Sequence, residues 1–582
     1  MIQSIDVTTA ERYRRDYHRF GPRVIQLTIE RRRRLTHRAL PVLAGLAVLA
    51  LIVGVVIGSG VGGDAERTAR AFGRAWERGD YRRMHELLTA EARTRWSVRD
   101  LRRAYAAAAD TATASTIDVG EPRGEQDGAM RLPVEVHTRV FRTVRGEVLV
   151  PVEEKAVAWA PHLVFPGLEP GVSLRRTTDA PPRGRILSRD GKVLAKGPAR
   201  ARSSTLGPLA GSIAGRVEAG GTAAEREAAY RRGFTHDWPV GQSGLERAFE
   251  RDLAGRPGGQ LIAGRRLLAR SRPVAGRPVR TTIDTRLQQA AMTALAGRFG
   301  GIAALDARTG QIRALAGVAF SAPQPPGSTF KIVTTTAALE ARKVKLSDRF
   351  PVQTRALVDG VGLENANGES CGGTFEASFA HSCNSVFAPL GVKVGARQLV
   401  SAAERYGFNA APSVPGELPS TIPAAREIRT PLEVASTAIG QGKVLATPLE
   451  LASIAQTVSA GGVRAVPTLR LGQARPAPVR VTARRIARTL ERLMVQVVAY
   501  GTGTAAALPG VKVAGKTGTA ELEDTRGPNA DTERDPNNTD AWFTAYAPVG
   551  RPKIAVGVMF VRAGAGGQTA APAARTVLDA AL

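Results

Sequence analysis

The segment Pro325-Pro326-Gly327-Ser328-Thr329-Phe330-Lys331 places a serine three residues before a lysine at the predicted start of a helix. Proline and glycine interrupt the preceding structure, and apolar residues continue in helical spacing as far as Leu339. Residues three apart lie on one face of a helix, so Lys331 can reach the hydroxyl of Ser328. The helix N-terminus also favours the alkoxide that forms there. Such a pair can make a serine nucleophilic without a histidine.

Two later motifs complete a known catalytic set. Ser382-Cys383-Asn384 has the form S-x-N, and Lys516-Thr517-Gly518-Thr519 contains K-T-G. An isolated S-x-x-K occurs often by chance, but S-x-x-K, S-x-N and K-T-G in this order, within one domain-sized stretch, are specific. The set points to acyl transfer through an active-site serine on penicillin-like or D-Ala-D-Ala substrates.

The choice of basic residues supports this interpretation. Only eleven of the 81 basic residues are lysines, yet lysine stands at positions 331 and 516. Arginine cannot act as a base at neutral pH, whereas a lysine that is desolvated or close to another cation can lose its proton. Beyond residue 236 the only histidine is His381, which we expect to be a loop residue, so a Ser-His-Asp triad has few candidates.

Together these motifs resemble those of class B penicillin-binding proteins, which are membrane-anchored, monofunctional peptidoglycan D,D-transpeptidases. The resemblance covers nearly the whole chain and is to the actinobacterial type with a nuclear-transport-factor-like N-terminal domain. No segment resembles a glycosyltransferase, which argues against a bifunctional class A enzyme. The further matching segments are Thr282-Ile283-Asp284, Ala304-Leu305-Asp306, Ile439-Gly440-Gln441-Gly442, Thr447-Pro448-Leu449, Arg183-Gly184-Arg185-Ile186-Leu187 and Gly244-Leu245-Glu246-Arg247.

The resemblance implies a role for each residue of the first two motifs. Ser328 would attack the carbonyl carbon of the penultimate D-alanine in a stem peptide and expel the terminal D-alanine, with Lys331 as the general base. Ser382 would relay a proton to the leaving amine, and Asn384 would hold the substrate amide and the Lys331 side chain. An amine from a neighbouring stem peptide would then resolve the acyl-enzyme.

The resemblance also implies that Lys516 lies on a strand that lines the cleft. Thr517 and Thr519 would present hydroxyls to the substrate carboxylate, and Gly518 would let the substrate backbone approach closely. The backbone N–H groups of Ser328 and Thr519 would form the oxyanion hole, where one donor is worth about 3 to 4 kcal/mol in other acyl-transfer enzymes. We expect neither a metal nor a cofactor.

We expect a multidomain α+β protein, because 582 residues are enough for three or four domains. By resemblance, its catalytic domain is of the serine β-lactamase/transpeptidase-like class, with an antiparallel sheet flanked by helices and an all-helical subdomain. The expected parts are a cytoplasmic basic tail (1–38), a transmembrane helix (39–63), a nuclear-transport-factor-like cone domain of helices and a curved sheet (64–160), a pedestal or dimerisation domain (161–280) and the transpeptidase domain (290–582).

The expected anchor carries no charged side chain over residues 39–63 and is long enough to span a bilayer as a helix. Arginines at 31–34 and 38 precede it, so the positive-inside rule places the N-terminus in the cytoplasm and the catalytic domain outside. A cleaved signal peptide is the alternative, but the leading segment is long and no clear A-x-A site follows. We therefore expect a single-pass protein of the cell membrane.

Local patterns predict elements within two of these domains. Ser97 with Asp100 predicts a capping box before a helix that runs through Ala109. Alternating valines between 134 and 152 predict antiparallel strands with a hairpin turn at Arg145-Gly146. An acidic segment with prolines and asparagines, 521–540, predicts a loop that overhangs the cleft. The strands predicted in the catalytic domain are 302–306, 311–316, 511–520, 541–547 and 554–560.

The only cysteines, Cys371 and Cys383, flank a short segment that leads into the S-x-N motif. In an oxidising extracytoplasmic space, a disulfide is favoured over two free thiols. Closing so short a loop contributes about 3 kcal/mol in the chain-entropy model and would fix Ser382 and Asn384.

The net charge of +29 invites a nucleic-acid interpretation, but no basic motif with interleaved aromatic residues and no known DNA-binding pattern accompanies it. We expect no nucleic-acid partner. The expected partners are peptidoglycan stem peptides, β-lactams and the cell membrane. The resemblance adds a glycan polymerase, other proteins of the elongation or division complex, and a homodimer.

Other functions remain open. A serine β-lactamase would share the motifs but needs fast deacylation, and no water-activating carboxylate is evident. A D,D-carboxypeptidase would release D-alanine to water, yet the pedestal and the additional domain fit a transpeptidase better. The third alternative is a non-enzymatic cell-wall scaffold or β-lactam sensor. The intact motifs and the lack of an attached signalling domain argue against a sensor, whereas a scaffold role is compatible with catalysis.

Overall fold

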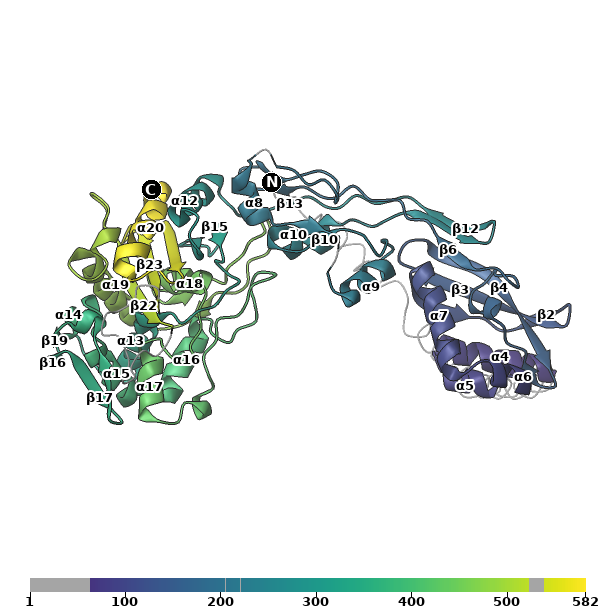
Figure 1. Cartoon of the computed structure of the whole chain (residues 1–582), viewed down its shortest axis with the longest axis horizontal. Helices are drawn as coiled ribbons and strands as arrows, with labels where there is room; N and C mark the ends of the chain where they lie inside the picture. Colours follow the sequence, from purple (N-terminus) through teal and green to yellow (C-terminus); the bar gives the residue numbers. More distant parts are fainter. Residues whose placement is uncertain (1–62, 205, 220, 523–537) are drawn as a thin grey trace, which may run out of the picture. The chain divides into compact units, whose positions relative to one another are not determined.

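The computed structural model describes residues 63–204, 206–219, 221–522 and 538–582 (Figure 1). Within these residues, no helix is long and apolar enough to cross a membrane. The expected tail and anchor lie outside the described residues, except for Gly63, and so does most of the predicted loop, residues 523–537. The chain forms two compact units, one comprising 63–138, 142–175 and 261–269, the other 139–141, 176–260 and 270–582.

The first unit packs helices against a five-stranded antiparallel sheet, in which β1, β3, β4 and β5 are successive neighbours and β2 pairs with β3. Its helices are α4 (Asp64–Glu77), α5 (Tyr81–Glu86), α6 (Ala90–Arg95), α7 (Val98–Ala112) and the 3-10 turn η2 (Pro161–Val164). Its strands are β1 (Ala114–Val119), β2 (Arg123–Gln126), β3 (Ala129–Thr138), β4 (Arg142–Glu153) and β5 (Ala156–Val157).

In this unit the α-helices precede the strands along the chain, as expected. The capping box of Ser97 and Asp100 starts α7, as predicted, and the helix ends at Ala112, three residues beyond the prediction. Buried aromatic residues of the helices pack near one another, and the buried Tyr105 hydroxyl accepts a hydrogen bond from Trp159 Nε1 at 3.1 Å. This bond satisfies a polar group that would otherwise be costly to bury.

The predicted hairpin turn at Arg145-Gly146 is wrong. Both residues lie inside β4, where Arg145 pairs with Glu135 and Gly146 with Val134, and the chain reverses at residues 139–141 instead. The glycine has a packing reason, because a Cβ at Gly146 would lie 2.9 Å from Cβ of Pro166. A glycine in a strand often marks such a close approach rather than a turn.

The chain between 174 and 280 consists of short elements. Two segments that resemble the family's motifs meet in the second unit, where buried Arg183 donates to Glu246 at 2.8 Å and to Glu250 at 2.6 Å. Each charge has an opposite partner, as buried charges require. The elements are β6 (Leu174–Arg176), β7 (Ile186–Leu187), β8 (Val193–Ala195), α8 (Pro208–Ala214), β9 (Val217–Glu218), α9 (Ala223–Arg231), β10 (Val240–Gly241), α10 (Gly244–Ala248), α11 (Glu250–Leu253), β11 (Gly259–Ala263), β12 (Arg266–Ser271) and β13 (Val279–Arg280).

The second unit is built on a five-stranded antiparallel sheet of order β15-β14-β24-β23-β22. All five predicted strands are present, and their ends agree with the prediction within three residues. They are β14 (Gly300–Asp306), β15 (Ile312–Gly317), β22 (Ala514–Glu521), β23 (Thr539–Ala547) and β24 (Ile554–Phe560).

Helices cover both faces of this sheet. On β23, Phe543 and Ala545 join the apolar core under α12 (Thr285–Leu295) and α20 (Gly566–Ala581), while Trp542 and Tyr546 join the core on the opposite face. This alternation follows from the two-residue period of a strand. The opposite face carries α13 (Lys331–Glu340), α18 (Pro448–Ser459) and most of α19 (Arg484–Ala499).

The core on that second face continues into a mostly helical subdomain (Figure 1). Its helices are α14 (Phe375–Ala380), α15 (Asn384–Val394), α16 (Ala396–Tyr406) and α17 (Pro431–Ala438). The remaining short elements of the unit are β16 (Arg349–Gln353), β17 (Arg355–Val358), β18 (Val361–Glu364), β19 (Cys371–Thr374), β20 (Val463–Arg464), β21 (Val479–Arg480) and the 3-10 turns η3 (Gly327–Phe330), η4 (Ala366–Gly368), η5 (Ala425–Glu427) and η6 (Thr504–Ala506).

Candidate active site

Ser328 lies at the start of a helix, but its own turn is a 3-10 turn. η3 leads directly into α13, which begins at Lys331. The hydroxyl of Thr329 donates to the carbonyl of Pro326 at 2.8 Å and helps to fix the turn. Short 3-10 turns are common at helix N-termini, where the first N–H groups have no helical partner. Ser328 is partly exposed, whereas the residues on either side of it are buried.

Two glycines let this turn lie directly against the K-T-G strand, β22. Gly327 has φ +53°, and a Cβ there would lie 2.6 Å from the carbonyl oxygen of Thr519. A Cβ on Gly518 would lie 2.6 Å from the carbonyl oxygen of Pro326. Both distances are too short for any side chain, so the close approach of Ser328 to β22 depends on these glycines.

The side chain of Lys331 is fully buried and bonds to the S-x-N motif. Its Nζ donates to Asn384 Oδ1 at 2.6 Å, to the carbonyl oxygen of Ser382 at 2.7 Å and to Ser382 Oγ at 3.3 Å. Among the hydrogen bonds of the described residues, none joins Lys331 Nζ to Ser328 Oγ. Catalytic hydrogen bonds are often incomplete in the absence of substrate, so this geometry is compatible with a base acting on Ser328.

Lys516 approaches the same serine from β22. Its Nζ donates to Ser382 Oγ at 2.8 Å and to the carbonyl oxygen of Thr517 at 3.1 Å. Ser382 has φ +61°, a left-handed conformation that is uncommon for a residue other than glycine, asparagine or aspartate. This backbone conformation belongs to the turn between α14 and α15, which contains Ser382 and Cys383. Ser382 Oγ is therefore shared by two lysine side chains.

Both lysines have lowered pKa values. Burial, followed by the repulsion of the neighbouring Lys516, holds the pKa of Lys331 well below its usual value of 10.5. Burial lowers the pKa of Lys516 to about 7. A buried site disfavours the ammonium form, and two close ammonium groups disfavour each other. Neutral amines are thus accessible near neutral pH, and a neutral amine can accept a proton.

Sequence reasoning missed Thr502, which contacts the K-T-G strand. Its Oγ1 lies 2.5 Å from Thr517 Oγ1, and its backbone N–H donates to the carbonyl of Ala380 at 3.1 Å. In the sequence, the segment Tyr500-Gly501-Thr502-Gly503 shows only a weak glycine pattern, which is typical of a turn. On the same strand, the hydroxyl of Thr519 accepts a hydrogen bond from the backbone N–H of Gly566 at 3.3 Å.

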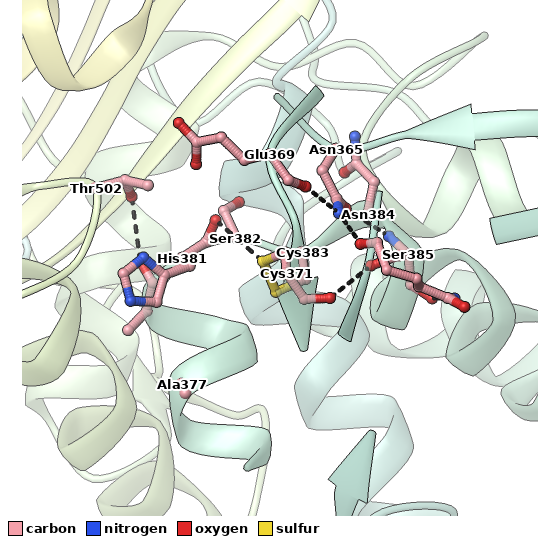
Figure 2. Close-up of a disulfide and its surroundings, with 12 residues drawn as sticks. Asn365, Glu369, Cys371, Ala377, His381, Ser382, Cys383, Asn384, Ser385 and Thr502 are labelled. Atoms are coloured by element: carbon pink, nitrogen blue, oxygen red, sulfur yellow. Dashed lines mark hydrogen bonds between the residues drawn. A yellow bond between two sulfur atoms is a disulfide. The ribbon is translucent and has the colours of Figure 1, made fainter. Parts of the chain in front are cut away.

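The two cysteines are joined in a disulfide beside the S-x-N motif, with their Cα atoms 5.4 Å apart. In Figure 2, Asn384 and Ser385 lie on one side of the disulfide and His381 on the other. His381 is exposed at the end of α14, and its ring lies 5.9 Å from that of Tyr500.

The structure brings the motif residues into one site, although they come from separate segments of the chain. Ser328 lies in η3 just before the helix of Lys331, Ser382 lies in the turn between α14 and α15, Asn384 is the first residue of α15, and Lys516 lies on β22. Within the described part of the chain, no group of three or more histidine, cysteine, aspartate or glutamate side chains could hold a metal ion. The fold and the three motifs define the class of serine acyltransferases whose motifs carry lysine and no histidine.

Comparisons with known proteins agree with this class. The penicillin binding protein transpeptidase domain matches residues 300–579, and the NTF2-like N-terminal transpeptidase domain matches residues 64–172. Peptidoglycan D,D-transpeptidase PbpA of Mycobacterium tuberculosis is 33% identical over 410 residues, which cover 58% of this chain and 79% of the relative. The chain belongs to the class B penicillin-binding proteins, the D,D-transpeptidase family.

Solved structures show the same fold. The penicillin G acyl-enzyme complex of penicillin-binding protein A from Mycobacterium tuberculosis aligns with a TM-score of 0.55 and 26% identity, covering 69% of this chain and all of that one (100%). The D,D-transpeptidase domain of a peptidoglycan glycosyltransferase from Eggerthella lenta aligns with a TM-score of 0.57 and 27% identity, covering 69% of this chain and 98% of that one.

Proposed function

We propose that this chain crosslinks peptidoglycan stem peptides through an acyl-enzyme on Ser328, releases the terminal D-alanine and binds penicillin covalently at the same serine. The observation that carries the proposal is the pair of buried lysines, Lys331 and Lys516, that share Ser382 Oγ beside the Ser328 turn. Both lysines have lowered pKa values, so the site can accept and return a proton near neutral pH.

In the acylation step, Ser328 Oγ attacks the carbonyl carbon of the penultimate D-alanine, and its proton passes to neutral Lys331. A bond forms between Oγ and the carbonyl carbon, and the carbonyl oxygen becomes an oxyanion. The backbone N–H groups of Ser328 and Thr519 are the proposed donors to that oxyanion. The close packing of Gly327 on Thr519 supports this assignment, because it brings the two backbones together.

The tetrahedral intermediate collapses when the C–N bond to the terminal D-alanine breaks. The leaving nitrogen needs a proton, and Ser382 is the proposed relay because its hydroxyl contacts both Lys331 and Lys516. The proton taken from Ser328 can thus reach the amine through Ser382, and free D-alanine leaves. Asn384, held on Lys331 Nζ, is proposed to fix the base and to contact the substrate amide.

Substrate binding is assigned to the K-T-G strand. Thr517 and Thr519 would donate hydroxyls to the terminal carboxylate, and Gly518 leaves space for an extended peptide beside the strand. Thr502 joins this set because its hydroxyl contacts that of Thr517 and fixes its orientation. A positive Lys516 would add electrostatic attraction for the carboxylate whenever it carries its proton.

The deacylation step distinguishes a transpeptidase from a β-lactamase or a D,D-carboxypeptidase. An amine of a neighbouring stem peptide attacks the acyl carbon, and the crosslinking amide forms as the ester bond between that carbon and Ser328 Oγ breaks. The proton that the amine loses passes to Ser328 Oγ and restores its hydroxyl. A β-lactamase or D,D-carboxypeptidase would instead use water at this step.

The decisive experiment is time-resolved intact mass after mixing the full-length chain, in detergent, with penicillin G. We expect a long-lived adduct of one penicillin per chain that is absent from Ser328→Ala. Rapid loss of the adduct with hydrolysis of the drug would favour a β-lactamase. The absence of any adduct in the wild-type chain would favour a scaffold role.

Beyond the catalytic unit, we propose the domain arrangement expected from the sequence. Residues 1–38 would be a cytoplasmic tail, 39–63 a transmembrane anchor, 64–160 the cone domain, 161–280 the pedestal and 290–582 the extracytoplasmic catalytic domain. The charge-free segment after a run of arginines supports the anchor and its orientation. Association with a glycan polymerase or with a second copy remains part of the proposal. Protease accessibility of both ends in sealed vesicles tests the topology.

A further inference from the structure

A segment outside the three motifs holds the S-x-N residues in place. We define the clasp as residues 361–374, which comprise β18, η4 and β19. Asn384 Nδ2 donates to the carbonyl oxygen of Glu364 in the clasp at 2.7 Å, while Asn384 Oδ1 accepts from Lys331 Nζ at 2.6 Å. The clasp carbonyl therefore orients the side-chain amide of Asn384, so that its oxygen, and not its nitrogen, faces the lysine.

The next residue, Asn365, anchors the clasp with both ends of its own amide. Its Oδ1 accepts the backbone N–H of Ser385 at 2.8 Å, and its Nδ2 donates to the carbonyl oxygens of Gln353 at 2.7 Å and Glu369 at 2.9 Å. Asn365 is only 2% exposed. Figure 2 shows its side chain pointing toward the start of α15, next to Asn384. A buried amide with this set of partners has a single orientation.

The disulfide provides a second attachment between the clasp and the motif. Cys371 belongs to the clasp, and Cys383 is the middle residue of S-x-N, between Ser382 and Asn384. The hydroxyl of Ser385 also donates to the carbonyl of Cys371 at 3.3 Å. A left-handed serine such as Ser382 persists only where the surroundings determine its backbone conformation, and the clasp supplies such surroundings.

We propose that Asn365 is a positioning residue for acylation: together with the Cys371–Cys383 disulfide, it keeps Asn384 Oδ1 and Ser382 Oγ on the two catalytic lysines. The proposal rests on the proposed roles of Lys331, Ser382 and Asn384. It adds a residue that lies outside the three motifs and acts through them. Displacing a catalytic group by about 1 Å can cost about a hundredfold in rate, so a loosened clasp affects the chemical step.

The test measures acylation of the full-length chain in detergent by a fluorescent penicillin in stopped flow. This experiment separates the dissociation constant of the initial complex from the acylation rate constant. For Asn365→Ala we expect the rate constant to fall by about ten- to a hundredfold, and the dissociation constant to stay within about threefold. The pH midpoint of acylation should also move, because the environment of Lys331 changes.

Two further variants distinguish a positioning role of Asn365 from a general effect on the stability of the fold. Asn365→Asp keeps the acceptor for Ser385 N–H, so it should recover part of the lost rate. Asn409→Ala is the matched control, since Asn409 also bonds to the backbone through both ends of its amide, but at Ile422 instead of the clasp. Its acylation rate constant and pH midpoint should match the wild type.

The disulfide is tested without mutation by reducing the wild-type chain, with alkylation and intact mass to count the opened thiols. Reduction should lower the acylation rate constant. In Asn365→Ala, reduction should cause a smaller fold-change than in the wild type, because both changes loosen the same segment.

Each outcome decides the proposal. An unchanged rate constant and pH midpoint in folded Asn365→Ala, or an equal fall in Asn409→Ala, would overturn it. If both Asn365 variants fail to fold, an unchanged rate constant in the fully reduced wild type overturns it instead. Failure of the proposed function looks different: either the wild type forms no adduct, or Ser328→Ala still forms one.

Discussion

Two amines and one hydroxyl form the centre of this site, and their distances decide which protons can move. Lys331 Nζ is 3.3 Å and Lys516 Nζ is 2.8 Å from Ser382 Oγ. Because each lysine is desolvated, a proton on either one is easily given up. The hydroxyl between them connects the two amines without requiring either to move.

Replacing Lys331 by arginine puts a permanent positive charge where we propose a neutral amine, and it removes the proposed base, because a guanidinium does not lose its proton at neutral pH. We expect Lys331→Arg to lower the acylation rate constant for penicillin by about 10² to 10⁴. The measurement is the growth of the adduct by intact mass. The control is Lys343→Arg, which changes an exposed lysine just after α13. This variant should acylate at the wild-type rate. Near-normal acylation of Lys331→Arg would exclude Lys331 as the base.

The lowered pKa of Lys516 also predicts how stability depends on pH. Its pKa is about 7 in the folded chain, against a usual value of 10.5. Between these values the unfolded chain binds the proton and the folded chain does not, so the free energy of unfolding rises with pH. The slope from one such lysine is at most about 1.4 kcal/mol per pH unit.

We therefore expect Lys516→Met to show a smaller rise in the free energy of unfolding than the wild type between pH 7 and pH 9. The free energy is measured by denaturant titration at each pH. Lys343→Met is the control, and it should keep the wild-type slope because its side chain is exposed. Equal slopes for Lys516→Met and the wild type would mean that Lys516 is not neutralised by burial.

The contact between η3 and β22 leaves no room for a side chain at Gly327. Gly327→Ala places a Cβ 2.6 Å from the carbonyl oxygen of Thr519, and it also costs about 1 to 2 kcal/mol for the left-handed backbone. Gly360 has φ +76° in the turn between β17 and β18, with no atom within 4 Å of a Cβ. Gly360→Ala should therefore lose stability only through the left-handed backbone conformation.

We expect Gly327→Ala to lose stability beyond that of Gly360→Ala and to acylate much more slowly, while Gly360→Ala acylates normally. Thermal unfolding and adduct formation give the two measurements. If the two variants behaved alike, the close packing of the Ser328 turn on the K-T-G strand would be unimportant for acylation.

A strand such as β24 could be predicted because its apolar residues follow one another in a short, bounded run, whereas β22 could be predicted through its K-T-G motif. The capping box at Ser97 could be predicted for a similar reason, since its signal is local. The position of the hairpin turn could not be predicted, because a glycine such as Gly146 is typical of turns and the residue that packs against it cannot be identified from the sequence. Its role depends on Pro166, which approaches only in the folded chain.

The candidate site likewise contains residues that the sequence predicts and residues that it does not. The serine and the lysines stand in spaced motifs, so the sequence predicts them, and the two cysteines are conspicuous because they are the only ones. Asn365 and Thr502 carry no such signal. Each matters because of its contact with a motif residue that is distant in sequence, and a contact of this kind appears only when the chain is folded.

The catalytic motifs lie in one of the two compact units. Only the second contains the motif residues, whereas the first is an NTF2-like unit with its own apolar core. A ligand that binds only the folded state raises the stability of the unit that holds it. We therefore expect two transitions in calorimetry of the full-length chain.

Penicillin G should raise the midpoint of one transition by about 2 °C or more and leave the other unchanged. Ser328→Ala should show the same two transitions, with no shift on addition of penicillin. A single transition that shifts as a whole would mean that the two units unfold cooperatively.

The position of Cys383 within its motif also constrains how this chain can evolve. The middle residue of S-x-N is not itself one of the proposed catalytic groups, yet here it is covalently tied to Cys371. A single substitution at either position breaks this bond and leaves one buried thiol without its covalent partner. A change at Cys383 therefore also releases the cross-link that closes residues 371–383, so the middle position of this motif cannot be altered without affecting the segment that begins at Cys371.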